Sequence, residues 1–297
     1  MKDLSIIIVS YNTLDITRQC FEHLEKALQK SPSVSTEIIL VDNHSVDGSV
    51  EMLKQCHSDS KNVDVKTLFL ENNLGFSKGN NKGLELVTGK YVLFLNSDVY
   101  VQDVNFADLI HYLEEHEKVG VLTVRVQLPN GTIDPASHRG FPSLWNAFTY
   151  FTKLEKAFSP VPLLNRIFGG YHLTHLNLKT IHEIDSPTGA FYLTRASIMN
   201  KIKGFDEDYF MYGEDIDLSF RIKELGYKII YYPLFTVLHL KHRSGLKTTE
   251  STVQKKTGEH FYDSMGIFYN KNLAKKNSKV ENYLTHLFIK LKSKLPR

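Results

Sequence analysis

The chain is poor in cysteine, and this scarcity excludes two kinds of scaffold. Cys20 and Cys56 are its only cysteines among 297 residues, too few for a disulfide framework or a cysteine-based metal cluster. We therefore expect the protein to work in a reducing compartment. Cys20 falls among apolar residues spaced as on one face of a helix, so we predict that it belongs to the core.

The sequence also lacks a long apolar run and a strong charge. It has no stretch of about 18 apolar residues, so we expect no membrane-spanning helix. The strand-like DLSIIIVSYN lies at the start of the sequence, so we expect no secretory signal. The net charge of +3 is too small to indicate a nucleic-acid partner by itself. These absences, with 42% hydrophobic residues, predict a cytoplasmic globular protein.

What the first hundred residues do contain is an alternation of strand and helix patterns. The four predicted strands are 4–10, 37–42, 65–71 and 90–96. Near-continuous apolar strands separated by helices are typical of a parallel sheet covered on both faces. In such sheets ligands bind at the carboxyl ends of the strands. We therefore expect the polar residues that follow the strands to meet, namely Ser10-Tyr11-Asn12, Asp42-Asn43 and Asn96-Ser97-Asp98.

The second half predicts further elements. Residues 120–140 are interpreted as strands around a turn, and 227–233 as a strand that ends at Pro233. Residues 214–226 are predicted to form a helix closed by Gly226. Its predicted inward-facing positions are Ile216, Phe220 and Leu225.

Two regions differ from this alternation. Residues 141–180 are rich in aromatic side chains, including Trp145, and are interpreted as an irregular helical insert that serves as a lid or an acceptor-binding surface. The tail, 270–297, is basic and has an apolar stripe at helical spacing. The stripe consists of Leu284, Leu287, Phe288 and Leu291. Such a segment either lies on an anionic membrane surface or packs on the domain as a solvated helix.

Asp42 ends the second predicted strand, within VDNHSVDGS. It could accept a hydrogen bond from a ribose hydroxyl, as in dinucleotide-binding folds. The first turn, SYNTLD, however lacks the glycines that let a pyrophosphate approach the backbone, so a dehydrogenase is not expected. Asp42 could equally accept the N–H of a pyrimidine base, with Tyr11 stacked nearby. The structural alternative is an Asx-turn, which fits Asn43 better.

Asp98 is the first carboxylate after the buried strand YVLFL. Mg²⁺ and Mn²⁺ take oxygen ligands, usually from one or two carboxylates and the phosphates of a substrate. Asp98 and a diphosphate could hold such a cation, with His239 as a candidate further ligand; a simple turn is the alternative. The glycine-rich NNLGFSKGNNKG could bring its backbone and Lys78 near the same diphosphate.

The stretch MYGEDIDL supplies three carboxylates at the start of a predicted helix. Acidic residues in a first turn complement the helix dipole, which accounts well for Asp217. This explanation fits the Glu214-Asp215 pair less well. A carboxylate facing a substrate cleft could act as a general base toward a hydroxyl nucleophile.

In their order along the chain, these motifs resemble those of the family 2 glycosyltransferases of the GT-A fold, in particular the rhamnosyltransferase-like branch. The matching stretches are SIIIVSYN, ILVDNHSVDGS, NNLGFSKGNNKGL, YVLFLNSDV, DSPTGAFYLTR, GFDEDYFMYGEDIDLSFRIKELGYKIIYYP and VLHLKHRSG. The resemblance implies an α/β fold with a mostly parallel, Rossmann-like sheet flanked by helices. Its implied domains are a GT-A domain at 1–250, with a nucleotide-binding half at 1–100 and an acceptor-binding half at 101–250, and a basic helical extension at 251–297.

The resemblance also implies how the donor is bound. Tyr11 and Asp42 would hold the pyrimidine nucleoside of a UDP- or dTDP-sugar. The other implied contacts to the nucleotide-sugar are Asn12, Ser45, Gly75, Lys78, Asn96 and Ser97. Asp98 would be the last carboxylate of a DXD-type motif and would hold Mg²⁺ or Mn²⁺ together with His239. This chain has Asn96 where other members carry an acid, so the cation would depend mainly on Asp98.

On the acceptor side, the resemblance implies that Asp215 is the catalytic base and that Glu214 and Trp145 contact the acceptor. The chain would then be an inverting, metal-dependent glycosyltransferase, because a single base fits a single displacement. It would transfer a sugar, with rhamnose as a candidate, to a glycan or lipid-linked acceptor in cell-surface polysaccharide synthesis. The basic tail would contact the inner face of the cytoplasmic membrane.

Two other functions stay open at this point. A sugar-phosphate nucleotidyltransferase shares a nucleotide-binding α/β domain, but it would need a glycine-rich phosphate loop after the first strand. A catalytically inactive protein that binds carbohydrate or nucleotide-sugar would not need the three carboxylates Asp42, Asp98 and Asp215.

Overall fold

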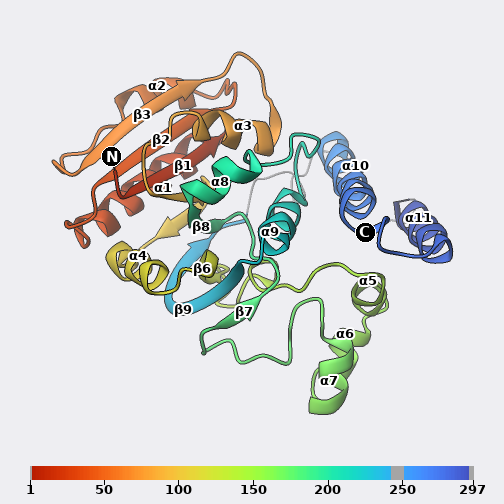
Figure 1. The fold of residues 1–297 in the computed structure, drawn as a ribbon. Coiled ribbons are helices and arrows are strands. Elements are labelled where there is room, and N and C mark those ends of the chain that lie inside the picture. Colours follow the sequence, from red (N-terminus) through yellow and green to blue (C-terminus); the bar gives the residue numbers. More distant parts are fainter. Residues whose placement is uncertain (1, 242–250, 294–297) are drawn as a thin grey trace.

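The computed structural model describes residues 2–241 and 251–293. One nine-stranded sheet runs through the centre of this part of the chain (Figure 1). From one edge to the other its strands are β3 (Val63–Phe69), β2 (Thr36–Asp42), β1 (Leu4–Ser10), β4 (Tyr91–Leu95), β8 (Phe191–Arg195), β6 (Val119–Gln127), β9 (Lys228–His239) and β5 (Val99–Val101), and β7 (His182–Ile184) pairs with β9.

The first four strands form the parallel half that the apolar runs predict, with β1 between β2 and β4 and β3 outside β2. Successive strand residues point to opposite faces of a sheet, so a run such as SIIIV must be covered on both sides. Ile6 and Ile8 pack with Cys20 and the other apolar residues of one face, whereas Ile7 belongs to the core of the other face. The predicted burial of Cys20 is confirmed.

Helices cover both faces of this sheet. The helices whose apolar residues join the first core are α1 (Leu14–Gln29), α2 (Ser49–Gln55) and α4 (Phe106–Glu115). Those on the opposite core are α3 (Gly75–Leu84), α8 (Ala196–Ile202) and α9 (Glu214–Glu224). This arrangement confirms the predicted α/β fold with flanking helices.

In its second half the sheet is mixed. β8 lies antiparallel between β4 and β6, and β5 and β7 lie antiparallel to β9. Because β8 runs against β4, its start lies beside the end of β4, where the backbone N–H of Asn96 donates to the carbonyl of Ala190 at 3.2 Å. The loop before β8 is thereby brought to the carboxyl edge of the parallel strands.

The strands β6 and β9 confirm part of the predictions for 120–140 and 227–233, but two details are wrong. The turn at Asn130-Gly131 is followed by a single bridge at Ile133 and a short 3₁₀ turn, η1 (Pro135–Ser137), because Pro135 has no N–H with which to continue a ladder. β9 does not end at Pro233 but continues to His239. Its register with β6 shifts between Tyr232 and Thr236, and such an irregularity tolerates a proline.

The predicted orientation of α9 is also wrong. The helix begins at Glu214 and ends before Gly226, whose φ is +85°, but Leu225 is exposed and Ile216 and Phe220 are only partly buried. Its buried residues are Glu214, Asp215, Asp217, Leu218, Ser219 and Ile222. The helix therefore turns carboxylates, as well as apolar residues, toward the protein.

Helices occupy both of the regions that break the alternation of strands and helices. Between 141 and 180 lie α5 (Leu144–Phe151), α6 (Leu154–Phe158) and α7 (Pro162–Phe168), which we call the insert. The chain then returns through β7 and β8 and ends in α10 (Ser251–Phe268), the π-helical turn η2 (Tyr269–Leu273) and α11 (Lys279–Ser293). Among the described helices, none combines the length and the apolar character that crossing a membrane requires.

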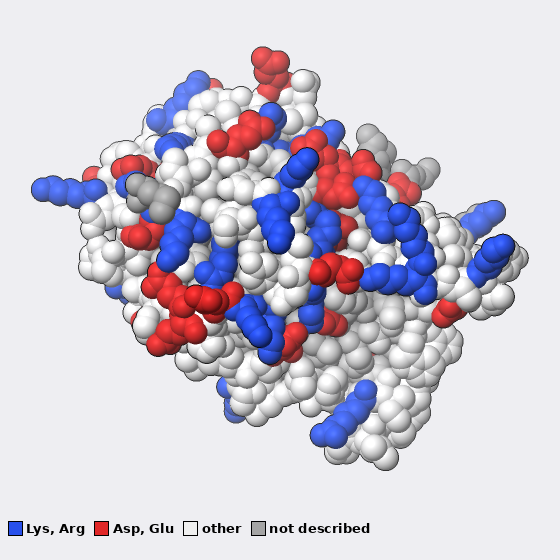
Figure 2. Space-filling view, viewed as in Figure 1, with Lys and Arg blue, Asp and Glu red and all other residues white. Residues whose placement is uncertain are grey.

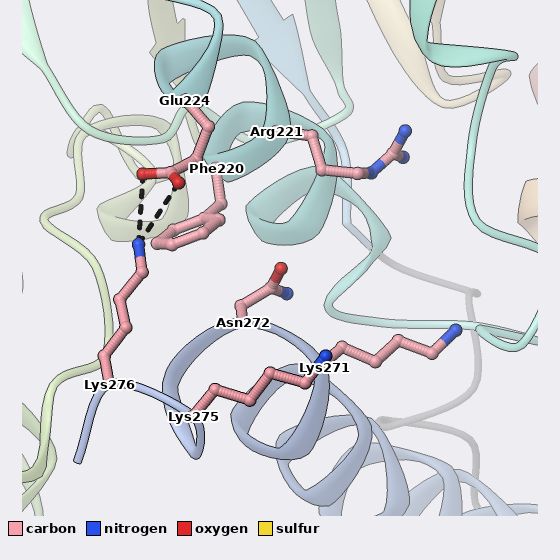
Figure 3. A pocket seen from close by; sticks show the side chains of 7 residues that line it. All are labelled: Phe220, Arg221, Glu224, Lys271, Asn272, Lys275 and Lys276. Atoms are coloured by element: carbon pink, nitrogen blue, oxygen red, sulfur yellow. Dashed lines mark hydrogen bonds and ion pairs between the residues drawn. The ribbon is translucent and has the colours of Figure 1, made fainter.

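The C-terminal helices are attached to the sheet domain through α9. Lys276 Nζ lies 3.2 Å from both carboxylate oxygens of Glu224 and 4.9 Å from the centre of the Phe220 ring (Figure 3). Asn272 Nδ2 donates to Asp217 Oδ1 at 2.8 Å. A surface cavity of about 210 Å³ lies between α9 and the turn η2, and Lys271 on its rim is paired with Asp206 and Asp208 outside it.

Gly75, the first residue of α3, is in a conformation that glycine adopts with little strain. Its φ is +81°, and a Cβ there would lie 2.5 Å from the carbonyl oxygen of Phe210. That carbonyl accepts the N–H of Phe76 at 2.7 Å, so it cannot move away freely. Gly131 has a similar φ of +83°, but the nearest atom to its Cβ position is 3.8 Å away.

We predict that Gly75→Ala lowers the free energy of unfolding by at least about 1 kcal/mol more than Gly131→Ala does. Both substitutions carry the left-handed strain of roughly 1–2 kcal/mol, but only the first adds a clash with backbone. Urea unfolding of the two variants measures the difference. Equal losses would show that the contact with Phe210 imposes no constraint.

Candidate active site

The loops that follow β1 and β2 are tied to each other at the carboxyl edge of the sheet. Ser10 and Asp42 lie opposite each other in the register of the two strands. Just beyond them, the N–H of Asn12 donates to Ser45 Oγ at 2.9 Å, and the N–H of Val46 donates to Asn12 Oδ1 at 2.8 Å. The structure thus brings together three residues of the predicted nucleotide site, Asn12, Asp42 and Ser45.

Asp42 is buried, but only one of its two carboxylate oxygens accepts a hydrogen bond. Its Oδ2 accepts the N–H of Ser45 at 2.9 Å, so Asp42 itself closes the loop rather than Asn43. Its Oδ1 is buried and has no hydrogen-bond partner among the described residues. Tyr11 beside it is 46% exposed. A buried acceptor without a partner is costly unless a ligand supplies a donor.

Asn43 has a structural role that joins this edge to α3. Its Oδ1 accepts the N–H of Leu74, and its Nδ2 donates to the Asn73 side chain and to the carbonyl of Gly75. The entry of α3 is therefore held against the end of β2. Lys78 lies one turn further along α3 and is partly buried.

Asp98 and His239 are brought together by the short antiparallel ladder of β5 and β9. Val99 pairs with His239, and the N–H of Leu240 donates to the carbonyl of Asp98 at 2.9 Å. Asp98 Oδ1 then lies 3.3 Å from His239 Nε2. On its other side, His239 Nδ1 donates to Asp134 Oδ2 at 2.9 Å. Asp134 is fully buried and also accepts from Lys241 Nζ at 2.8 Å.

This geometry calls for a proton or a metal ion shared by His239 Nε2 and Asp98 Oδ1. The carboxylate of Asp134 can only accept, so Nδ1 of His239 carries a proton and Nε2 is the nitrogen that faces Asp98. A lone pair facing a carboxylate is unfavourable unless a proton or a metal ion lies between them. Burial opposes a charge on His239, but its hydrogen bonds to Asp134 and Asp98 raise its pKa to about 9.

The donor set therefore fits a divalent cation. Metal-ligating histidines usually donate their other ring N–H to a carboxylate, as His239 does to Asp134. Asn96, at the end of β4, has a buried side-chain oxygen, Oδ1, with no hydrogen-bond partner among the described residues. Ser97 between Asn96 and Asp98 is partly buried.

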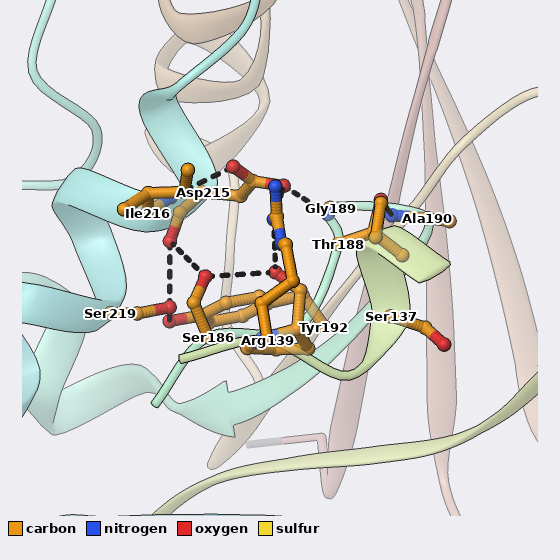
Figure 4. Close-up of polar contacts among 12 residues, drawn as sticks. Ser137, Arg139, Ser186, Thr188, Gly189, Ala190, Tyr192, Asp215, Ile216 and Ser219 are labelled. Carbon is orange, nitrogen blue, oxygen red and sulfur yellow. Dashed lines mark hydrogen bonds and ion pairs between the residues drawn. The ribbon is translucent and has the colours of Figure 1, made fainter. Parts of the chain in front are cut away.

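Asp215 lies at the start of α9 in a second buried cluster (Figure 4). Its Oδ2 accepts from Arg139 Nη2 at 2.7 Å and from the N–H of Gly189 at 3.2 Å. Its Oδ1 accepts the N–H of Ile216 at 2.8 Å. The side chains of Arg139 and Asp215 are only 10% and 11% exposed, and Arg139 also donates to the carbonyl of Pro187. This ion pair fixes the orientation of the Asp215 carboxylate.

Asp215 keeps the capacity to act as a base. A carboxylate has about four lone-pair directions, and three are occupied here, so one remains for the hydroxyl of a substrate. The neighbouring carboxyl group of Glu214 has a raised pKa. Burial, and then the charge of Asp215, raise its pKa to about 8. Its Oε2 is buried without a hydrogen-bond partner in the described part of the chain.

Asp134 and Arg139, which are not among the predicted site residues, support the two clusters from one segment. Asp134 lies behind His239, and five residues later Arg139 reaches Asp215. The segment is held by backbone hydrogen bonds between Arg139 and Ser186. In the sequence, this segment differs from its surroundings by the Asp134-Pro135 pair and by Arg139. We interpreted the whole stretch 120–140 only as strands around a turn.

Trp145, the predicted acceptor contact, lies in the insert. Its side chain is 47% exposed, its Nε1 donates to the carbonyl of Ile167 at 2.9 Å, and its ring packs near Phe148 and Phe168. Among the described residues the structure shows no contact between Trp145 and Glu214 or Asp215. Its role toward the acceptor stays a prediction.

Two protein-family models match the chain that carries this site. The model of glycosyl transferase family 2 matches residues 5–174, and that of glycosyl transferase family group 2 matches residues 93–265. The chain belongs to glycosyl transferase family 2. It is therefore a glycosyltransferase. This result favours glycosyl transfer over the nucleotidyltransferase and the inactive binding protein that the sequence left open.

Among curated proteins, this family member is similar to two rhamnosyltransferases. It is 26% identical over 248 residues to rhamnosyltransferase WbbL of Escherichia coli, covering 80% of this chain and 83% of the relative. It is 27% identical over 237 residues to the N-acetylglucosaminyl-diphospho-decaprenol L-rhamnosyltransferase of Mycobacterium tuberculosis, covering 75% of this chain and 73% of the relative. The predicted resemblance to the rhamnosyltransferase-like branch is confirmed.

Among solved structures, Staphylococcus aureus TarS in complex with UDP-GlcNAc superposes with a TM-score of 0.57 at 19% identity. The match covers 89% of this chain and 65% of that one, so this chain spans about two thirds of the TarS structure. The likeness confirms the predicted GT-A fold.

We predict that Arg139→Met lowers the free energy of unfolding by roughly 3–5 kcal/mol, because it leaves Asp215 charged, buried and without its partner. The double variant Arg139→Met/Asp215→Asn should recover part of this loss. Lys82→Met is the control, since it breaks an exposed pair with Glu85 that contributes at most about 1 kcal/mol. Urea unfolding measures all three. A loss for Arg139→Met no larger than for Lys82→Met would contradict the assignment of a buried ion pair.

Proposed function

We propose that this glycosyltransferase is an inverting enzyme that uses a UDP- or dTDP-sugar, with rhamnose as the candidate sugar. The observation that carries the proposal is Asp215, a buried carboxylate held in place by Arg139 with one lone-pair direction still available. The rhamnosyltransferase names of both curated relatives support the choice of sugar.

In the proposed reaction, Asp215 takes the proton of an acceptor hydroxyl as that oxygen attacks the anomeric carbon of the donor sugar. The bond from the anomeric carbon to the diphosphate oxygen breaks, and its electron pair leaves with the nucleoside diphosphate. Attack from the face opposite the nucleotide inverts the anomeric centre. Arg139 and the N–H of Gly189 hold the carboxylate in place and stabilise its ionised form before the proton is transferred.

The donor would bind along the carboxyl edge of the parallel strands. The unsatisfied Oδ1 of Asp42 is available to a pyrimidine N–H, and the exposed ring of Tyr11 is available to stack on the base. The joined loops of Asn12 and Ser45 would frame the nucleoside, and the remaining predicted contacts would face the diphosphate and the sugar. These are Gly75, Lys78, Asn96 and Ser97.

Asp98 and His239 would hold Mg²⁺ or Mn²⁺, with Asp134 orienting the imidazole of His239. When bound, the cation would neutralise charge on the departing diphosphate. Within residues 2–241 and 251–293, no group of three or more histidine, cysteine or acidic side chains could hold a metal ion. Oxygens of the diphosphate and of water would therefore complete the ligand set, as is common for Mg²⁺.

The acceptor would be a glycan or a lipid-linked saccharide of cell-surface polysaccharide synthesis. The relative from Mycobacterium tuberculosis carries the name of a decaprenol-linked acceptor, which supports a lipid carrier. Glu214 and Trp145 are the proposed acceptor contacts. An enzyme with such an acceptor would work at the inner face of the cytoplasmic membrane, with its basic tail in contact with the lipid surface.

We predict that Asp215→Asn lowers kcat by about 10²–10⁴-fold, the usual contribution of general base catalysis. Glu214→Gln should mainly raise KM for the acceptor. Release of UDP or dTDP from a panel of UDP-, dTDP- and GDP-sugars, measured with a polyprenyl diphosphate-linked acceptor, separates the two effects. Asp108→Asn, an exposed carboxylate in the first turn of α4, is the control.

Full transfer by a folded Asp215→Asn variant would overturn the assignment of the base. Donor binding without hydrolysis or transfer, across the whole panel of donors, would overturn the proposed reaction itself.

For the metal, we predict that Asp98→Asn abolishes Mn²⁺ binding in the presence of UDP or dTDP. Asp134→Asn should weaken it by roughly 10–100-fold, because the supporting partner of His239 becomes neutral. Titration followed by electron paramagnetic resonance of free Mn²⁺ measures binding without any turnover. Unchanged affinity in the Asp98→Asn variant would exclude Asp98 as a ligand.

A further inference from the structure

Most of the large apolar side chains that are exposed in the described residues fall in two segments. In the insert they are Trp145, Phe148, Tyr150, Val161, Leu163 and Ile167. In α11 they are Val280, Tyr283, Leu284, Leu287 and Leu291. A concentration of this kind on a soluble domain marks an interaction surface.

The five exposed apolar residues of α11 form a stripe that faces away from the protein, whereas Phe288, which belongs to the predicted stripe, packs against Phe151. With 3.6 residues per turn, its five residues fall within an arc of about 100°. The opposite side of the helix makes the contacts with the rest of the chain. There Thr285 is buried, and Asn282 bonds to the hydroxyl of Tyr269 and the carbonyl of Ala274. Among the described residues no element covers the stripe, since its members are 39–68% exposed.

Lysines border this stripe on both sides. At the same helical spacing, Lys279 and Lys290 fall along one border, and Glu281 and Lys292 fall along the other. Glu281 is the one acidic residue of the helix. An apolar stripe bordered by lysines is a pattern of helices that lie in the interface of a membrane with anionic lipids.

The insert continues this surface. The ring of Phe288 in α11 lies 5.2 Å from that of Phe151 in α5, and Lys292 Nζ lies 5.0 Å from the same Phe151 ring. Figure 1 places α5, α6, α7 and α11 on one side of the molecule, and Figure 2 shows a largely uncharged surface over the insert. We call the exposed apolar residues of α11 and the insert, with the bordering lysines, the docking surface.

Charge decides between a membrane and a second copy of the chain as the occupant. Two copies that met through α11 would bring lysine borders together, and Glu281 alone is available there to pair with them. Glu155 of the insert is buried and already bonded to His172. An anionic lipid surface supplies the negative charge that the docking surface lacks.

We propose that the docking surface binds an anionic phospholipid bilayer through α11 and the insert together. The apolar side chains enter the boundary between headgroups and acyl chains, and the lysines remain at the phosphates. The proposal rests on the proposed function in one respect, namely that the acceptor is carried by a lipid. It adds the insert to the basic tail as part of the membrane contact.

The test is co-sedimentation of the full chain with vesicles of equal parts phosphatidylglycerol and phosphatidylcholine. Leu284→Gln/Leu287→Gln should weaken binding by about tenfold or more, because two leucines no longer enter the bilayer. Leu234→Gln is the matched control, since Leu234 is 63% exposed on β9, outside the docking surface. Lys279→Gln/Lys290→Gln should weaken binding to these vesicles but not to phosphatidylcholine alone.

The insert can be tested directly because Trp145 is the single tryptophan of the chain. In the unchanged protein, its fluorescence should shift to shorter wavelength when vesicles are added, and phospholipids brominated on their acyl chains should quench it. Fluorescence that is unaffected by vesicles that do bind the protein would exclude the insert from the contact.

Equal vesicle binding by the leucine variant and the Leu234→Gln control would overturn the proposal. So would self-association of the unchanged protein without vesicles that the leucine variant abolishes, because a second copy would then be the occupant. Transfer to a water-soluble acceptor should be the same in the leucine variant and the unchanged protein. A failure of the proposed reaction would abolish that transfer and leave vesicle binding intact, so the two failures are distinguishable.

Discussion

The buried ion pair of Arg139 and Asp215 is the constraint on which the catalytic side of this structure depends. A charge removed from water is costly unless its partner and its hydrogen bonds are in place. Here the partners come from the segment after β6, the loop before β8 and the first turn of α9. These three segments must therefore be assembled together before a fixed, ionised carboxylate exists at the carboxyl edge of the sheet.

The same segment also supports the pair of Asp98 and His239, which links the proposed base to the proposed metal site. Asp134 and Arg139 are separated by the single turn η1, and backbone hydrogen bonds to Ser186 hold that turn in place. A displacement of this segment would move the support of His239 and the support of Asp215 at once. The segment of Asp134 and Arg139 thus positions both His239, on the proposed leaving-group side, and Asp215, on the proposed acceptor side.

The predictable part of this structure is the part that local patterns encode. Apolar runs located the parallel strands, and their carboxyl ends located Asp42 and Asp98. Asp134 and Arg139 could not be found in this way, because they act on partners 105 and 76 residues away in the chain. The inward face of α9 was misassigned for a related reason: its buried positions include carboxylates whose partners lie elsewhere, so apolar spacing alone selected the wrong side.

One helix joins the proposed chemistry to the docking surface. The first turn of α9 carries Glu214 and Asp215, and its later turns hold the C-terminal helices through Glu224 and Lys276. Asp217, on the buried side of the same helix, accepts from Asn272. Asn282 of α11 bonds in turn to Tyr269 and Ala274, so hydrogen bonds through η2 connect α11 to the helix that carries Asp215. A bilayer bound at α11 would therefore hold a lipid-linked hydroxyl at a defined height relative to the base.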